Sequence, residues 1–342
     1  MENKAEISKY ILEVKNLKKY FPIDTNLFGV PSRYLKAVDD VSFSVERGQT
    51  IGIVGESGCG KTTLGRTILR LYECDGGQII FDGNDITNVS RRTMNKYRTD
   101  IQLIFQDPYS SLPPRMTVGE IIGEAVRVHK IVPKEEVVEY VLDIMKKCGL
   151  QAQHYDRYAH EFSGGQRQRI CIARALAVNP KLVICDEPVS ALDVSIQAQI
   201  INLLKELQTK LGLTYVFISH DLSVVKYITN QILVMYLGNV MELGDTKEIF
   251  SNPLHPYTKA LFSAVPVPDP DVKMNRIILS GDIPSPANPP SGCKFHTRCN
   301  SCMGVCKKVV PEYVMVEENH YVACHLYNKE IMANLDSYSS GE

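Results

Sequence analysis

Short apolar runs alternate with longer amphipathic segments along the chain, and the two patterns predict different elements. Residues 50–55 (TIGIVG), 181–188 (KLVICDEP) and 214–221 (TYVFISHD) each contain a short run that is almost wholly apolar and rich in β-branched side chains. Such runs are typical of parallel strands that are covered on both faces. Residues 10–21 and 37–45 instead show partial alternation of apolar and polar positions, which predicts strands with one buried face.

Helical periodicity dominates the middle of the chain. Residues 118–129 and 134–150 both carry an amphipathic stripe and end in basic residues or glycine, as helices commonly do. We therefore expect a helical subdomain over about residues 108–165. Two other segments contain glycine turns. Residues 76–86 predict a strand with a turn at Asp82-Gly83, and residues 231–244 predict a β-hairpin with its turn at Gly238-Asn239.

A change in composition marks the C-terminal part of the chain. Seven prolines lie between Val265 and Ser291, which excludes a long helix there and predicts an extended connection. A cluster of cysteines follows this connection. The patterns together predict an α/β fold with a parallel-sheet core, an antiparallel β subdomain and the helical subdomain. We expect this domain over residues 1–263, and the Pro-rich connection with a Cys-rich extension over residues 264–342.

Charge and hydropathy narrow the class of protein. The 342 residues have a formal net charge of −1, which argues against a nucleic-acid partner because nucleic-acid binders usually carry a basic face. No apolar run approaches the roughly 20 residues that a membrane-spanning helix needs. The first residues, MENKAEISKYILEV, lack the apolar core of a signal peptide, so we expect the chain to stay in the cytosol.

The sequence GESGCGKTT (55–63) predicts a phosphate-binding loop. It spaces Gly55, Gly60 and Lys61 as a P-loop requires, after an apolar strand and before a helix, a context that a purely structural glycine turn does not need. The glycines allow backbone N–H groups to surround nucleotide phosphates, Lys61 would reach the β- and γ-phosphates, and Thr62 would bind Mg²⁺. The residues expected to contact the nucleotide are Gly55, Glu56, Ser57, Gly58, Cys59, Gly60, Lys61, Thr62 and Thr63.

A strand that ends in two acids indicates that the bound nucleotide is hydrolysed. The run LVICDE (182–187) places Asp186 and Glu187 at the end of a buried strand. Asp186 would hold Mg²⁺ through water, as the acid of a Walker B strand does, and Glu187 would orient and polarise the attacking water. A solvated acid pair is the alternative, and the accompanying P-loop argues against it.

The segment SGGQ (163–166) predicts a second site for anions. Ser163 is a candidate N-cap, and Gly164 and Gly165 expose backbone N–H groups at the start of a helix that continues through Leu176. A plain capped helix would have the same first residue. Because one nucleotide needs only one phosphate cradle, the second site predicts that two chains share each nucleotide.

Six motifs, in their order along the chain, resemble those of the ATP-binding subunits of ABC transporters. They are GESGCGKTT (Walker A), IFQDP with Gln106 (Q-loop), SGGQ (signature), LVICDE (Walker B), SALD ending in Asp193 (D-loop) and ISHD with His220 (switch histidine). The resemblance covers roughly residues 10–260. It implies a head-to-tail dimer with two ATP molecules at the interface, each held between the Walker A motif of one chain and the signature of the other.

The resemblance also implies roles for single residues. Tyr20 is similar to the aromatic residue that stacks on adenine in this family. The implied catalytic residues are Lys61, Glu187 and His220. The implied Mg²⁺ ligands are Thr62, Gln106 and Asp186. The other residues that complete the nucleotide site in the resemblance are Ser163, Gly164, Gly165, Gln166 and Asp193.

The C-terminal region resembles one branch of this family. The segments NPLHPYTKALFSAVP (252–266) and GCKFHTRC (292–299) are similar to the C-terminal extension of the oligopeptide/dipeptide importer ATPases. This implies a chain that couples ATP hydrolysis to peptide uptake at the cytoplasmic face of the membrane. The implied partners are a second, non-identical ATPase, two permeases and an extracytoplasmic binding protein.

Four cysteines of the extension predict a metal or cluster site: Cys293, Cys299, Cys306 and Cys324. Four thiolates can hold Zn²⁺ or a [4Fe–4S] cluster, and their spacing does not match the usual zinc ribbon. The resemblance favours the iron–sulfur cluster. Cys302 adds a C-x₂-C pair with Cys299, and His296 and His325 are additional zinc-binding groups. Zinc and reduced thiols therefore stay open as alternatives.

Three other functions are compatible with parts of the sequence. A nickel importer is the nearest alternative, because the resemblance makes nickel importers of the same group near relatives. A soluble ABC ATPase that acts on DNA or ribosomes usually has two nucleotide domains or a long coiled coil, and this chain has neither. A metal-dependent regulator with a vestigial nucleotide fold would not need the residues of hydrolysis, and those residues are intact.

Overall fold

Two compact units make up the chain. The computed structural model describes residues 8–25, 31–265 and 276–333. The first unit, which contains the signature and is called the signature unit below, consists of Met1–Glu13, Ser44–Thr50 and Ile80–Ser219. The second, called the P-loop unit, consists of Val14–Phe43, Ile51–Ile79 and His220–Glu342.

Three parallel strands form the core of the signature unit. They are β6 (Ile101–Ile104), β7 (Leu182–Asp186) and β8 (Thr214–Ile218). Leu182 pairs with Ile101 on one side and with Thr214 on the other. Every residue of β7 and β8 is buried, which confirms that these apolar runs are strands covered on both faces.

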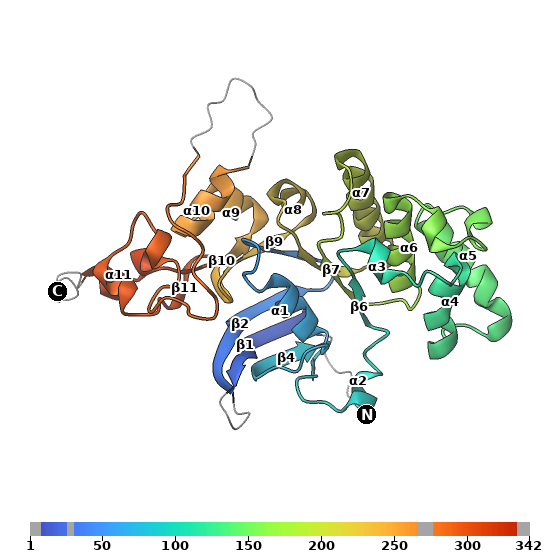
Figure 1. Cartoon of the computed structure of the whole chain (residues 1–342), viewed down its shortest axis with the longest axis horizontal. Coiled ribbons are helices and arrows are strands. Elements are labelled where there is room, and N and C mark those ends of the chain that lie inside the picture. The colour runs from blue at the N-terminus through green and yellow to red at the C-terminus, as the bar shows by residue number, and fades with distance from the viewer. Residues whose placement is uncertain (1–7, 26–30, 266–275, 334–342) are drawn as a thin grey trace, which may run out of the picture. The chain divides into compact units, whose positions relative to one another are not determined.

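Helices account for most of the remaining signature unit (Figure 1). The α-helices are α2 (Arg91–Met94), α3 (Pro108–Ser111), α4 (Val118–His129), α5 (Val137–Lys147), α6 (Gly164–Leu176) and α7 (Val194–Leu211). The short 3₁₀ turns are η1 (Lys134–Glu136), η2 (Ala152–His154) and η3 (Ala159–Glu161). Helix α4 spans the residues that the periodicity predicts, and it begins at a capping box between Thr117 and Glu120.

A mixed sheet forms the core of the P-loop unit. Its strands are β3 (Thr50–Val54), β9 (Gln231–Tyr236), β10 (Asn239–Asp245), β12 (His320–Ala323) and β11 (Tyr313–Glu317). β3 and β9 are parallel, and the other pairs are antiparallel. The hairpin of β9 and β10 turns at Leu237-Gly238 rather than at Gly238-Asn239, because Asn239 already pairs with Tyr236. Positive φ angles of 43° at Leu237 and 82° at Gly238 suit this tight turn.

A second, four-stranded sheet has the order β2-β1-β4-β5. Its strands are β1 (Tyr10–Thr25), β2 (Pro31–Glu46), β4 (Gly76–Phe81) and β5 (Asn84–Asp85), and the first three run through both units. Helix α1 (Lys61–Ile68) follows β3. The structure therefore confirms the predicted α/β class with strands of both orientations.

The C-terminal region continues the P-loop unit. It contains α8 (Leu222–Ile228), α9 (Thr246–Ser251), α10 (Pro256–Ser263), η4 (His296–Arg298), η5 (Gly304–Lys307), η6 (His325–Tyr327) and α11 (Lys329–Ala333). Residues 276–291 are irregular, as their prolines predict, and residues 266–275 of the same connection lie outside the described ranges. Strand β12 pairs with β10, with Glu242 opposite Val322, so the Cys-rich extension adds two strands to the sheet. The sequence pattern did not predict these strands.

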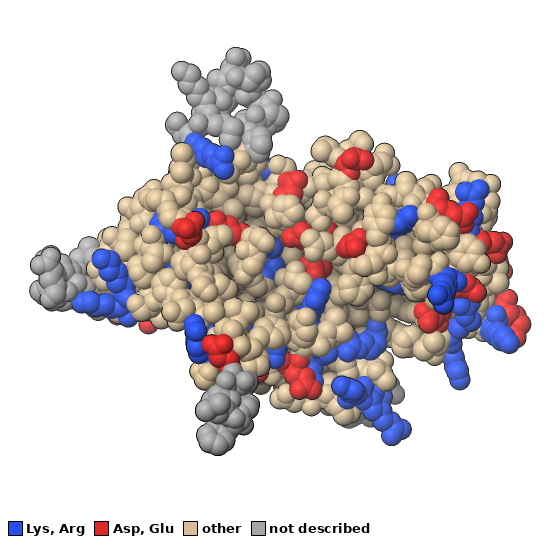
Figure 2. Space-filling model, in the orientation of Figure 1, with Lys and Arg blue, Asp and Glu red and all other residues tan. Residues whose placement is uncertain are grey.

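The surface of the chain carries charges of both signs. Acidic and basic side chains are interspersed over the face drawn in Figure 2, in keeping with the formal net charge of −1. Among the residues for which a structure is described, no helix combines the length and apolar character that crossing a bilayer requires.

Candidate functional site

The P-loop connects β3 to α1 through backbone conformations that require glycine. Gly55 has a φ of 148° and Gly60 a φ of 105°. A Cβ atom at Gly55 would lie 2.2 Å from the carbonyl oxygen of Met235, and one at Gly60 would lie 2.0 Å from that of Ala37. Both positions therefore exclude side chains, and the close packing fixes the path of the loop.

Lys61 lies inside this loop. Its Nζ atom donates to the carbonyl oxygens of Gly55, at 2.8 Å, and Glu56, at 3.1 Å. Only 6% of Lys61 is exposed, so the ammonium group depends on these partners. Phosphate oxygens entering the loop can replace the two carbonyls as acceptors, because an ammonium group offers three donors in flexible directions.

The side chain of Cys59 is buried beside Lys61. It is 3% exposed, and its Sγ atom lies 3.8 Å from the Nζ atom of Lys61. Burial raises the pKa of the Cys59 thiol, although the nearby ammonium group opposes this effect. The side chain therefore behaves as a small neutral core residue, even though its backbone belongs to the loop.

The acids of β7 and the Q-loop glutamine meet in the signature unit. Asp186 is the last residue of β7 and is 2% exposed. Glu187 follows with a φ of 47°, which is uncommon for a residue with a side chain, and its N–H donates to the carbonyl of Ile218 at 3.0 Å. The Nε2 atom of Gln106 donates to Oε2 of Glu187 at 2.8 Å. The structure thus brings together two motifs that are distant in sequence.

The D-loop contacts the same acid, Glu187. The Ser190 hydroxyl donates to the carbonyl oxygen of Glu187 at 3.1 Å. Asp193 stands at the N-cap of α7, without a side-chain hydrogen bond to the first turn of that helix. The acid pair and the D-loop therefore lie within one short stretch, from the end of β7 to the start of α7.

The signature residues begin α6. Ser163 is its N-cap and forms a capping box: the N–H of Ser163 donates to Oε1 of Gln166 at 3.1 Å, and the N–H of Gln166 donates to the Ser163 hydroxyl at 3.4 Å. Ser163 itself is exposed, Gly164 is half-buried and Gly165 is buried, so solvent reaches the start of this 13-residue helix at its N-cap. A phosphate at this end would be favoured by the helix dipole.

Tyr20 is held by polar contacts within the P-loop unit. Its hydroxyl donates to Oδ1 of Asp39 at 2.5 Å, and its N–H donates to Oδ2 of Asp75 at 2.7 Å. The Lys36 ammonium lies over the ring, 5.4 Å from its centroid. Burial, followed by the hydrogen bond to Asp39, raises the pKa of Tyr20, so the phenol is neutral at physiological pH.

The predicted residues fall into two sets, one in each unit. Tyr20, the loop 55–63 and His220 belong to the P-loop unit. The signature unit holds Gln106, the segment 163–166, Asp186, Glu187 and Asp193. His220 follows β8 and is exposed.

The cysteines of the extension converge, but they do not form the predicted metal site. Cys293, Cys306 and Cys324 are buried and Cys299 is half-buried. Burial raises the pKa of the Cys293 thiol to about 12, and the neighbouring thiols of Cys299, Cys306 and Cys324 add to the rise. Over the described ranges, no group of three or more histidine, cysteine or acidic side chains is arranged to hold a metal. The structure therefore supports neither the iron–sulfur nor the zinc prediction.

Several polar residues near the P-loop were not predicted from the sequence. Arg298 and Lys294, which lie between cysteines of the extension, pair with Glu56 and Asp39. Glu242 is fully buried and accepts from the backbone N–H groups of Leu254 and His255 and from His320. The signal in the sequence was the pair of cations, Lys294 and Arg298, between the cysteines of GCKFHTRC.

Comparisons with known proteins identify the family in which these motifs occur. Residues 38–190 match the family model described as ABC transporter, and residues 241–306 match the one described as oligopeptide/dipeptide transporter, C-terminal region. The oligopeptide transport ATP-binding protein AppF of Bacillus subtilis is 55% identical over 93% of this chain and 98% of its own length. The chain belongs to the ATP-binding proteins of oligopeptide ABC transporters.

Solved ATP-binding cassettes share the fold of this oligopeptide transporter ATP-binding protein. CbiO1 from Clostridium perfringens, part of the ABC transporter complex cbiONQ, matches with a TM-score of 0.62 at 30% identity, over 72% of this chain and 92% of that one. The cassette MJ0796, in a dimeric post-hydrolysis state bound to ADP and Pi, matches with a TM-score of 0.61 at 28% identity, over 69% and 98% of the two chains. Membership of this ATPase family implies ATP and Mg²⁺ as ligands.

Proposed function

We propose that this chain is the ATP-hydrolysing subunit that drives uptake of oligopeptides or dipeptides across the cytoplasmic membrane. The observation that carries the proposal is the 55% identity to an oligopeptide transport ATP-binding protein over almost the whole chain, including the C-terminal region. The relatives' names refer to peptides, which favours peptide over nickel as the cargo.

Hydrolysis is assigned to residues of the motifs that resemble those of ABC ATPases. The P-loop amides and Lys61 bind the phosphates, and Thr62 and Asp186 are the proposed Mg²⁺ ligands. The ion would neutralise charge on the phosphate oxygens. Glu187 orients and polarises the attacking water, and its contact with Gln106, at 2.8 Å, supports the view that the Q-loop controls the orientation of this carboxylate. His220 is assigned to the γ-phosphate.

The exposed signature supports an ATP site shared between two ATPase chains. Ser163, the N-cap of α6, faces solvent, where a nucleotide held by a partner's P-loop can reach it. The dimeric cassette MJ0796 shares this fold. We assign the complex a second, non-identical ATPase, two permeases and an extracytoplasmic peptide-binding protein, with this chain at the cytoplasmic face of the membrane.

Transport by the reconstituted complex tests the proposal. Proteoliposomes that contain the permeases and both ATPases, with ATP on the ATPase side, should accumulate a radiolabelled oligopeptide supplied with the binding protein. A matched preparation with Lys61→Ala in this chain should accumulate far less. Radioactive Ni²⁺ is measured in parallel. Nickel uptake without peptide uptake, or peptide uptake that persists in full without this chain, would contradict the assignment.

A further inference from the structure

Two cations of the Cys-rich extension contact the elements that the proposed function assigns to ATP. Arg298 ends η4 and Lys294 lies four residues before it, so both belong to one short segment. Arg298 pairs with Glu56 of the P-loop, and Lys294 pairs with Asp39, the hydrogen-bond partner of Tyr20. All of these residues lie within the P-loop unit.

Arg298 fixes the phosphate end of the site. Its Nη1 and Nη2 atoms donate to the two carboxylate oxygens of Glu56, at 2.7 and 3.1 Å. This two-point contact defines the orientation of the carboxylate as well as its position. The N–H of Glu56 donates to the Tyr257 hydroxyl at 2.9 Å, and its carbonyl accepts from Lys61. Arg298 thus acts on Lys61 through the residue whose carbonyl holds the ammonium group.

An aromatic cluster holds the segment in place. Phe295 is 1% exposed, and its ring centroid lies 5.3 Å from those of both Tyr236 and Tyr257. The Arg298 side chain also lies over the Tyr236 ring, 6.0 Å from its centroid. The burial of Phe295 anchors the backbone of the segment independently of the charges. Removing either cation should therefore leave the segment docked.

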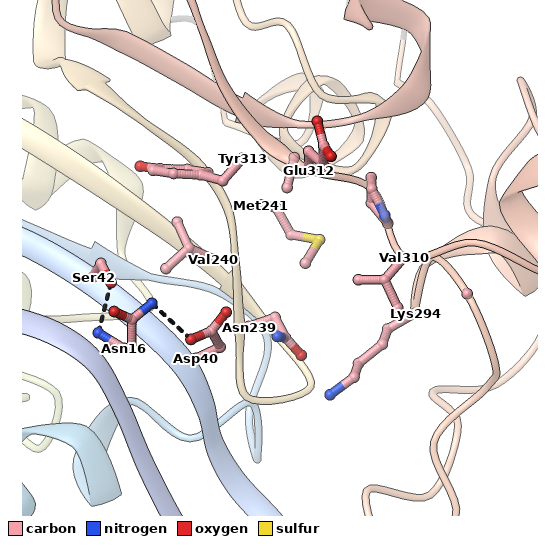
Figure 3. Close-up of a pocket in the computed structure, with 13 residues that line it drawn as sticks. Asn16, Asp40, Ser42, Asn239, Val240, Met241, Lys294, Val310, Glu312 and Tyr313 are labelled. Atoms are coloured by element: carbon pink, nitrogen blue, oxygen red, sulfur yellow. Dashed lines mark hydrogen bonds between the residues drawn. The ribbon is translucent and has the colours of Figure 1, made fainter. Parts of the chain in front are cut away.

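Lys294 fixes the end that is assigned to the adenine. Its Nζ atom lies 3.1 Å from Oδ2 of Asp39, while Oδ1 of the same carboxylate accepts from the Tyr20 hydroxyl. Figure 3 shows Lys294 pointing toward the turn between β9 and β10, where it also donates to the Leu237 carbonyl at 3.4 Å. It lies at the edge of a cavity of about 240 Å³ that β2, β10 and the extension line together. Lys294 thus links the extension to Asp39.

We infer that Arg298 and Lys294 are positioning residues for ATP, the first acting on the phosphate cradle through Glu56 and the second on the Tyr20 ring through Asp39. The inference rests on the proposed ATP site. Both ion pairs are largely buried, with side-chain exposures of 8% and 24% for Arg298 and Glu56 and of 13% and 15% for Lys294 and Asp39. They therefore constrain geometry more than exposed pairs do, whose partners sample many orientations. The extension thereby becomes part of the nucleotide site.

Measuring the binding of two ligands to the full-length chain tests the two ends of the site independently. Mg-ATP engages both ends, whereas Mg-tripolyphosphate has no base and engages the phosphate cradle alone. Isothermal titration calorimetry measures both Kd values for Arg298→Gln and Lys294→Gln. We expect Arg298→Gln to raise both Kd values by about tenfold, and Lys294→Gln to raise the Kd of Mg-ATP by about threefold while leaving that of Mg-tripolyphosphate unchanged. A general loosening of the extension would not produce this split.

Two further variants complete the design. Lys307→Gln removes an exposed cation from the same extension and should change neither Kd value. Glu56→Gln weakens the Arg298 pair from the other side, so it should reproduce the Arg298→Gln pattern, and the double variant should be no worse than either single one. Thermal unfolding shows whether Arg298→Gln folds. If it does not fold, Glu56→Gln still tests the inference.

The outcomes distinguish the inference from the proposed function. If the wild-type chain binds both ligands and the cation variants bind them equally well, or if Lys294→Gln weakens both ligands alike, the inference is wrong. A wild-type chain that binds neither Mg-ATP nor Mg-tripolyphosphate would instead contradict the proposed function itself.

Discussion

Backbone and side-chain hydrogen bonds hold Glu187 in the described structure. Its N–H donates to Ile218, its carboxylate accepts from Gln106, and its carbonyl accepts from Ser190. Glu187 has a positive φ angle, and these contacts offset the conformational cost of that backbone conformation. A carboxylate that is fixed in this way can orient a water molecule without first being ordered itself.

We predict that Glu187→Gln retains binding of ATP and loses hydrolysis. The amide keeps the size of the side chain, but it cannot polarise water as a carboxylate does, so turnover should fall by about 100-fold or more. Phosphate release by the assembled complex measures turnover, and calorimetry measures binding. Glu206→Gln, which removes an exposed acid of α7 that pairs with Lys210, serves as the control and should behave as wild type. Turnover near the wild-type rate in Glu187→Gln would remove this residue from its assigned role.

A single buried residue, His255, leads to a prediction about how the stability of the fold depends on pH. It is 1% exposed, caps α10 and accepts the Tyr257 N–H at its Nδ1 atom. Burial lowers the pKa of His255 from 6.5 to about 4, although the nearby Glu242 opposes this effect. The unfolded chain therefore binds more protons between these pH values, and the contribution of neutral His255 to stability is lost as pH falls from 6.5 toward 4.

The variant His255→Asn isolates this effect. Asparagine can also accept the Tyr257 N–H, and it does not titrate. The wild-type chain should lose about 2 kcal/mol more of its unfolding free energy between pH 7 and pH 5 than the variant does. Urea unfolding at a series of pH values measures the difference. Parallel pH dependences in the two proteins would show that His255 is not responsible.

At the level of elements, the signature helix depends on close packing against its neighbour. A Cβ atom at Gly165 of α6 would lie 2.5 Å from Cγ2 of Ile196 in α7. The second glycine of SGGQ therefore lets α6 and α7 approach each other, in addition to its expected contact with phosphate. A helix N-terminus that binds an anion must be placed accurately, and this packing provides the placement.

We expect Gly165→Ala to lower the unfolding free energy of the chain by about 1–3 kcal/mol, because the added methyl group overpacks the contact between these two helices. Thermal unfolding measures the change. Combining it with Ile196→Ala opens space for the new methyl group and should restore part of the loss. If the second substitution makes the loss larger, steric overlap at Ile196 is not its cause.

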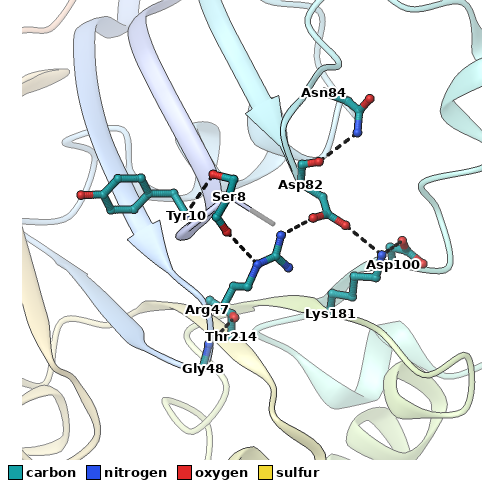
Figure 4. Close-up of polar contacts among 9 residues, drawn as sticks. All are labelled: Ser8, Tyr10, Arg47, Gly48, Asp82, Asn84, Asp100, Lys181 and Thr214. Carbon is teal, nitrogen blue, oxygen red and sulfur yellow. Dashed lines mark hydrogen bonds and ion pairs between the residues drawn. The ribbon is translucent and has the colours of Figure 1, made fainter. Parts of the chain in front are cut away.

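At the scale of the whole chain, ion pairs join distant segments of the signature unit. Arg47 and Lys181 both pair with Asp82, and Lys181 also lies 3.0 Å from Asp100 (Figure 4). Burial raises the pKa of Asp82, but hydrogen bonds from Arg47 and Lys181 outweigh this effect and lower it overall. This network connects the start of the unit to the strands of its core.

Asp82→Asn should destabilise the chain at pH 7 by about 1 kcal/mol, a small value because the network is partly exposed. Since the folded pKa lies below the unfolded value of 3.8, the carboxylate stabilises the fold above that pH, and the contribution is lost as pH falls through the folded pKa. Thermal unfolding at pH 7 and pH 3 measures both effects. Asp156→Asn removes an exposed acid of the same unit as a control. An equal destabilisation by both variants would argue against the network.

Among the predictions made from the sequence, those based on local patterns agree best with the elements in the structure. The runs at β3, β7 and β8 and the periodicity of α4 each match an element in the structure. Continuous apolar runs and amphipathic stripes have few alternative ways to bury their side chains, so such patterns predict elements well. The hairpin turn at Leu237-Gly238 was displaced by one residue, because turn position depends on which residues of the two strands pair.

The Cys-rich extension shows where such reasoning failed. The family resemblance favoured an iron–sulfur cluster at Cys293, Cys299, Cys306 and Cys324, and the structure brings these residues together without a metal-binding arrangement. Strands β11 and β12 were also missed, since most residues of β11 are exposed and carry no clear alternation. Spacing along a chain does not specify the directions of side chains, and ligation depends on those directions.

The sequence by itself determined the α/β class, the phosphate loop, the acid pair and the family to which they belong, because each depends on residues that are adjacent or periodic along the chain. Only the tertiary structure showed that Gln106 meets Glu187, that β12 pairs with β10, and that Arg298 and Lys294 contact the proposed ATP site. These contacts join residues far apart in sequence, and their partners are selected by the packing of the whole unit rather than by any local pattern.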